Sequence, residues 1–95
     1  GEKPNPLANK SYAFALQVVN VYKTLVSVKK EFVLSKQLLR SGTSIGANIA
    51  EANGAISKAV FFAKISIAYK ESLETKYWLN LLKDSEYLDE EKLMG

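Results

Sequence analysis

The sequence predicts an all-α chain, an up-down helical bundle with three long helices and the start of a fourth. Three segments place apolar residues at steps of three and four, which is the spacing of helices that bury one face. Both prolines lie before residue 11, so neither interrupts these segments. With 95 residues, 47% of them apolar, the chain makes a single domain with a modest core.

The first helix is expected over residues 11–28, after an irregular leader over residues 1–10. Two prolines predict the leader, and Asn9 or Ser11 can accept hydrogen bonds from the free amides at the start of the helix. The broad apolar face holds Phe14, Val18, Val21, Tyr22, Leu25 and Val28, and the polar face holds Gln17, Asn20, Lys23, Thr24 and Ser27. The breadth of the apolar face predicts contacts with more than one neighbouring helix.

The second helix is expected over residues 32–53, followed by Gly54, which suits a left-handed cap. Its core stripe holds Leu34, Leu38, Ile45, Ile49 and Ala52. Beside the stripe runs a polar line that holds Gln37, Ser41, Ser44, Asn48 and Glu51. This line is either a solvent face or a half-buried ladder, and we favour hydrogen bonds to other helices for Gln37, Asn48 and Glu51.

The other flank of the second helix carries a ridge of small residues, Gly42, Gly46 and Ala50. Each glycine within a helix costs about 1 kcal/mol relative to alanine. A close backbone contact should offset this cost. We expect a neighbouring helix to approach closely at the ridge.

The third helix is expected over residues 57–83, with Ser57 as its cap. Apolar residues occupy nearly all of its sides. Such a helix must be buried nearly all round, and three helices cannot enclose it. We therefore expect additional protein surface, an oligomer interface that includes Val60, Ile67, Trp78 and Leu81.

A fourth helix is expected to start in residues 89–95. Asp89 is a good cap, two glutamates follow it, and Leu88 with Leu93 has the spacing of a hydrophobic staple. One turn is too short to be stable by itself. The four-helix bundle is thus expected to be truncated here: either the native protein is longer, or a partner supplies the missing helix.

The chain contains neither cysteine nor histidine. This excludes disulfides and thiolate chemistry, and it removes the commonest general base and metal ligand. Glu71 and Glu74 share an E-x-x-E spacing, but ion-paired or solvated carboxylates explain it better than a metal site, since no E-x-x-H motif completes one. No phosphate-binding loop occurs either. We expect no enzyme and no catalytic, cofactor or metal site; a small enzyme that uses Glu51 or Glu71 is the weakest alternative.

Charged residues are unevenly distributed along the chain. The net charge of +3 combines +7 over residues 1–83 with −4 over residues 84–95. A nucleic acid should therefore bind to the first part of the chain, where cations can displace counterions from phosphate. The candidate phosphate contacts are Lys23, Lys29, Lys30, Lys36 and Arg40. The alternative is that these cations only keep the bundle soluble.

No uncharged stretch reaches the roughly 18 apolar residues that a membrane span needs. The first residues also lack the apolar centre of a signal peptide. We expect a cytoplasmic protein without a membrane partner, a location that the absence of cysteine fits.

The segments from Phe32 to Ala52 and from Ser57 onward resemble the four-helix bundle proteins encoded in intervening sequences of bacterial 23S rRNA genes. The most specific element is the pattern Q-x-x-R-x-x-x-S-I-x-x-N-I-x-E, held by Gln37, Arg40, Ser44, Ile45, Asn48, Ile49 and Glu51. The resemblance covers nearly the whole chain. It implies an up-down four-helix bundle that assembles as a ring-like homopentamer, in a family whose members are mostly without an established activity. It also implies kinship with the accessory variability proteins of diversity-generating retroelements, which resemble basic pentameric barrels that bind nucleic acid and a reverse transcriptase.

We therefore expect a non-enzymatic, homo-oligomeric helical-bundle protein that binds RNA or DNA through a basic surface. The alternative is a structural or scaffolding protein. In that case its partner would be another polypeptide, docked on the face that carries Trp78 and Leu81.

Overall fold

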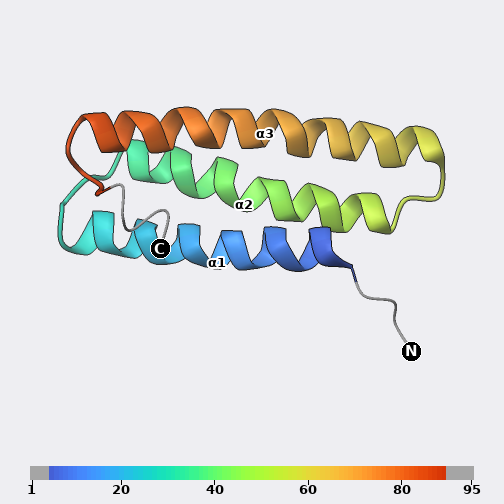
Figure 1. Ribbon diagram of the computed structural model, residues 1–95, viewed down its shortest axis with the longest axis horizontal. Helices are drawn as coiled ribbons and strands as arrows, with labels where there is room; N and C mark the ends of the chain where they lie inside the picture. Colours follow the sequence, from blue (N-terminus) through green and yellow to red (C-terminus); the bar gives the residue numbers. More distant parts are fainter. Residues whose placement is uncertain (1–4, 90–95) are drawn as a thin grey trace.

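The computed structural model describes residues 5–89, which form three helices and no strand. The helices are α1 (Pro6–Ser27), α2 (Leu34–Asn53) and α3 (Lys58–Asp84). They lie side by side with α2 between the other two, and the chain reverses direction at both loops (Figure 1). The prediction of an all-helical chain is confirmed. None of the described helices is long and apolar enough to cross a membrane.

The first helix begins at Pro6, earlier than expected. Asn5 caps it, since the Asn5 side chain accepts a hydrogen bond from the Ala8 amide at 3.1 Å. Pro6 occupies the first turn, where its missing N–H is not needed and its fixed φ suits a helix. The leader predicted over residues 1–10 is therefore wrong from residue 6 onward, because the second proline starts the helix instead of preceding it.

The other helix ends lie close to their expected positions, with two differences. α2 starts two residues late, at Leu34, because the Glu31 side chain caps it there. Gly54 ends α2 as expected, but its φ is −97°, so the predicted left-handed cap is wrong. Ser57 caps α3 as predicted and accepts a hydrogen bond from the Val60 amide at 3.1 Å.

Helices α1 and α2 approach closely at the small residues of α2. A Cβ atom at Gly42 would lie 2.8 Å from Val18 Cγ2, which is too close for two carbon atoms. At Gly46 it would lie 3.3 Å from the backbone oxygen of Ser11. The close helix contact predicted for the glycine ridge is confirmed.

The core lies where the three helices meet, toward the end that carries the α1–α2 loop. Its fully enclosed cluster consists of Val18, Leu25, Leu38 and Leu82. Residues 85–89 turn back after α3, and Tyr87 and Leu88 pack against this cluster. The expected start of the fourth helix, residues 89–95, lies outside the described residues except for Asp89, which is not helical.

Helix α3 exposes much of its apolar surface. Its exposed large apolar residues are Val60, Phe61, Phe62, Ile67, Tyr69, Leu73, Tyr77 and Leu81. Within residues 5–89, the expectation that three helices cannot enclose α3 is thus confirmed.

Candidate nucleic-acid interface

The loop between α1 and α2 is organised around the side chain of Glu31. One carboxylate oxygen accepts hydrogen bonds from the amides of Val33 and Leu34 at 3.0 and 2.9 Å, and the other accepts from the Ser35 amide at 2.6 Å. The Ser35 hydroxyl in turn donates to the Glu31 carbonyl at 2.7 Å. Glu31 therefore satisfies the free amides at the start of α2, which also favour a negative charge through the helix dipole.

Glu31 is ionised despite its burial. Desolvation raises the pKa of this carboxyl, but the hydrogen bonds from the backbone amides and from Ser35 outweigh it and hold the pKa below its ordinary value. The negative charge lies inside the loop, because only 8% of Glu31 is exposed. It therefore stabilises α2 without standing on the surface beside the lysines. The cap position of α2 holds Val33 and not the Ser, Thr, Asp or Asn that usually marks the start of a helix, so the sequence carries no ordinary cap signal there.

Four of the five candidate phosphate contacts are exposed lysines. Lys29 and Lys30 belong to the loop, Lys36 to the first turn of α2, and Lys23 to the last turns of α1. Within residues 5–89, none of the four forms an ion pair. Lys30 has a φ of 56°, in the left-handed region. These four lysines, defined here as the loop lysines, can meet an anion without first releasing a carboxylate.

The fifth candidate, Arg40, has a different environment. Its guanidinium forms an ion pair with Glu71 at 3.2 Å and a second one with Glu74. Both partners come from α3, more than thirty residues away in sequence, so local spacing could not predict these pairs. Arg40 is thus neutralised by two carboxylates, and the lysines remain the available cations of the set.

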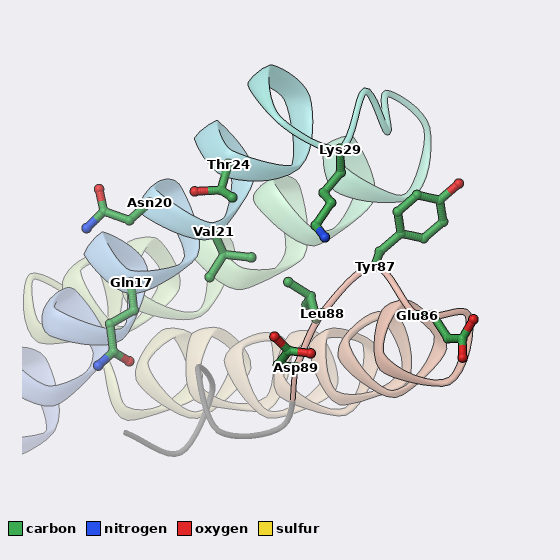
Figure 2. Close-up of a pocket in the computed structure, with 9 residues that line it drawn as sticks. All are labelled: Gln17, Asn20, Val21, Thr24, Lys29, Glu86, Tyr87, Leu88 and Asp89. Carbon is green, nitrogen blue, oxygen red and sulfur yellow. The ribbon is translucent and has the colours of Figure 1, made fainter.

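Lys29 also borders a pocket of about 330 Å³ between α1 and the segment that follows α3. Figure 2 shows the Lys29 side chain reaching toward Leu88. The pocket is lined by Gln17, Asn20, Val21, Thr24, Lys29, Glu86, Tyr87, Leu88 and Asp89. Three of these, Gln17, Asn20 and Thr24, were expected on the solvent side of α1. Because two acidic residues share the pocket with one lysine, its charge does not favour an anion.

The polar line of α2 divides between contacts to α3 and contacts within α2. Ser41 shares a buried hydrogen bond with Thr75 at 3.0 Å, and Glu51 accepts one from Lys64 at 3.1 Å. The Asn48 side chain instead donates to the Ser44 carbonyl of its own helix at 2.8 Å.

Two further members of this line make no bond to α3 within residues 5–89. Ser44 donates to the Arg40 carbonyl at 2.6 Å, and Gln37 is exposed without a side-chain hydrogen bond there. The ladder is therefore partly a link between helices and partly an exposed face, so neither alternative describes the whole line.

The residues predicted for an oligomer interface lie on α3. Val60, Ile67 and Leu81 are 41%, 39% and 37% exposed. Trp78 is half-buried, and its Nε1 has no hydrogen-bond partner within residues 5–89 although that atom is buried. A buried N–H without an acceptor is costly. Trp78 packs partly against the core cluster, so it is less accessible than the other three residues.

The carboxylates considered for enzyme or metal chemistry all face cations. Glu71 and Glu74 pair with Arg40, and Glu51 pairs with Lys64. Residues 5–89 contain no group of three or more acidic residues arranged to hold a metal ion.

Comparison with known proteins decides the family. The family model of the 23S rRNA-intervening sequence protein matches residues 4–94. The chain belongs to this family. The resemblance to the proteins encoded in intervening sequences of 23S rRNA genes is thereby confirmed.

A solved structure of the family has nearly the same fold. It is a protein of unknown function from the S23 ribosomal protein family of Bacteroides thetaiotaomicron. The two chains share 56% sequence identity and superpose with a TM-score of 0.90. The match covers 93% of the present chain and 82% of the Bacteroides chain. No curated protein matches the chain.

Proposed function

We propose that this chain is a non-enzymatic subunit of an oligomeric helical bundle that binds RNA or DNA through the loop lysines. The proposal is supported by a difference between two groups of basic residues, those that form ion pairs and those that do not. Arg40 and Lys64 are paired with carboxylates, whereas Lys23, Lys29 and the other loop lysines are exposed and unpaired within residues 5–89. Cations of this kind bind phosphate by releasing its counterions.

The proposal includes a fourth helix that completes an up-down bundle, as in the proteins that the sequence resembles. Tyr87 and Leu88 support it, because they bring the chain after α3 back against the core beside α1. The proposal also includes a homopentamer, kinship with the retroelement accessory proteins and a cytoplasmic location. A reverse transcriptase is the protein partner that this kinship implies.

A salt titration with labelled RNA and DNA tests the nucleic-acid part. We expect affinity to fall log-linearly with salt, with a slope of about −0.9 for each phosphate contact on a duplex. The double variant Lys30→Glu, Lys36→Glu should weaken binding and flatten the slope. Lys76→Glu on α3 is the matched control and should leave both unchanged. An absence of binding at low salt would reject the proposal.

Arg40 is a poor choice for charge reversal. A glutamate at this position would face Glu71 and Glu74, so the variant would lose stability through like-charge repulsion. Its binding defect would then have two explanations.

The exposed apolar face of α3 favours a second candidate function, a scaffold for a protein partner. Leu81 is exposed on this face, whereas Trp78 packs partly against the core cluster. Light scattering tests the oligomer: a multiple of the 10.5 kDa chain mass is expected, and a mass near 10.5 kDa would reject self-association. An oligomer that binds no nucleic acid would favour the scaffold.

A further inference from the structure

The α1–α2 loop exposes apolar side chains among its lysines. Phe32 is 56% exposed and Val33 is 72% exposed. Lys29 and Lys30 precede this pair in the sequence, and Lys36 follows it. The loop therefore combines cations with an accessible aromatic ring.

The loop holds this arrangement through its own hydrogen bonds. The Glu31 amide donates to the Leu25 carbonyl at 2.9 Å, and the Glu31 carboxylate binds the amides on the other side of Phe32. The backbone on both sides of the ring is thus anchored. A surface that is ordered before binding loses less conformational entropy when a ligand arrives.

Lys36 lies within reach of the same ligand as the exposed apolar side chain of Val33. Val33 already has helical backbone angles, and Lys36 follows it at a spacing of three residues. Side chains at this spacing are neighbours on a helix, with Cβ atoms about 5–6 Å apart. The start of α2 therefore presents an apolar contact and a positive charge side by side.

We propose that the α1–α2 loop binds single-stranded nucleic acid, with the Phe32 ring stacked on an unpaired base and Lys30 and Lys36 on neighbouring phosphates. This inference rests on the proposed function and specifies the strand type. Stacking on an aromatic ring accepts any base, which fits a chain without a base-reading motif. A duplex shows only the edges of its bases, so the ring would have no base face to stack on.

A lipid surface is the competing ligand, because lysines beside apolar residues also bind anionic membranes. Interfacial anchoring generally uses the long apolar face of an amphipathic helix. The loop offers Phe32 and Val33 only, together with Val28 at its other end, which is 68% exposed. The single-stranded ligand is therefore favoured.

Fluorescence anisotropy with labelled oligouridine and with a fully paired RNA duplex of equal charge tests this inference. We expect the single strand to bind more tightly than the duplex. Phe32→Ala should weaken single-strand binding by roughly 5- to 150-fold, the range expected from the loss of one stacked base, and should leave duplex binding unchanged. Because Phe32 is exposed, the variant should keep the helix content of the parent chain, which circular dichroism checks.

Phe62→Ala is the matched control. Phe62 has a similar exposure of 61% and belongs to the start of α3, at the opposite end of the molecule from the α1–α2 loop (Figure 1). Its loss should not change the affinity for either RNA.

Phe32→Leu separates base stacking from apolar burial. Leucine keeps an apolar surface but has no aromatic face, so single-strand binding should fall nearly as far as in Phe32→Ala. Equal affinities of the parent chain for both RNAs, unchanged by Phe32→Ala, would overturn the inference and leave the proposed function intact. Vesicles of phosphatidylglycerol and phosphatidylcholine test the lipid alternative. The inference would be overturned in favour of lipid if Phe32→Leu still bound the vesicles, Phe32→Ala did not, and the parent chain showed no preference for single-stranded RNA. If neither RNA binds at low salt, the inference fails together with the proposed function.

Discussion

The α1–α2 loop and the seam between α2 and α3 use similar residues in opposite ways. In the loop, the acidic residue Glu31 is buried on backbone amides and the lysines around it are exposed. In the seam, Arg40 and Lys64 are paired with carboxylates from the facing helix. The availability of a cation therefore depends on which side chains the neighbouring helix places beside it. Lys36 and Arg40 are one turn apart on α2 and still differ in this respect.

The largest effect should come from Glu31→Ala, which removes the cap of the loop region. Three backbone amides would lose their acceptor, so we expect the free energy of unfolding to fall by about 2–3 kcal/mol. Urea unfolding followed by circular dichroism measures the change. If the free energy of unfolding fell by less than about 0.5 kcal/mol, as for an ordinary surface substitution, the loop would not be organised around Glu31.

The second-largest loss of stability should come from the buried hydrogen bond between α2 and α3. Thr75→Val leaves the Ser41 hydroxyl without its partner in the core, and we expect a loss of about 1–2 kcal/mol. The double variant Ser41→Ala, Thr75→Val removes both groups and should cost less than the sum of the single variants. Strictly additive losses in the unfolding experiment would contradict a direct bond between the two hydroxyls.

A smaller effect should appear as a pH dependence of the loop. The folded-state pKa of Glu31 lies below its ordinary value, so its ionisation stabilises the fold above the unfolded-state pKa of about 4.3. This contribution is lost as the pH falls through the lower, folded-state pKa. Glu31→Gln, which has no charge to lose, should show a shallower decline of stability in acid. Equal declines of the two proteins between pH 7 and pH 3 would exclude this role of the charge.

The smallest effects should separate Arg40 from Lys36. Arg40→Gln breaks two partly exposed ion pairs and leaves Glu71 and Glu74 facing each other, which should cost about 0.5–1 kcal/mol at low salt. Lys36→Gln should leave stability nearly unchanged, because within residues 5–89 this lysine has no carboxylate partner. The difference should shrink when the salt concentration is raised. Equal losses of stability in Arg40→Gln and Lys36→Gln would contradict the proposed difference between the ion-paired seam and the exposed loop.

Much of the fold could be predicted because helices are encoded locally. The spacing of apolar residues locates all three helices, and Ser57 is recognisable as a cap. The glycine ridge predicts the close approach of a neighbouring helix, and the structure shows that this helix is α1. Errors occurred at helix ends, where one residue type suits two structures. The sequence predicts Pro6 as part of a leader although proline also suits a first turn, and it predicts a left-handed cap at Gly54 that the backbone does not adopt.

The candidate site was less accessible from sequence. Its lysines could be listed, but the distinction between Arg40 and the others depends on Glu71 and Glu74, which the packing of α3 brings to it. The role of Glu31 was also missed, because its side chain acts from the loop on the amides of the next helix.

The sequence by itself thus determined the helices, the charge distribution, the absence of cysteine and histidine chemistry, and the family. Only the tertiary structure decided which polar groups meet, because a contact between Ser41 and Thr75 depends on the rotation and offset of two helices. These are set by the packing of whole helix faces, which no local pattern specifies. The same packing pairs some cations with carboxylates and leaves the loop lysines exposed.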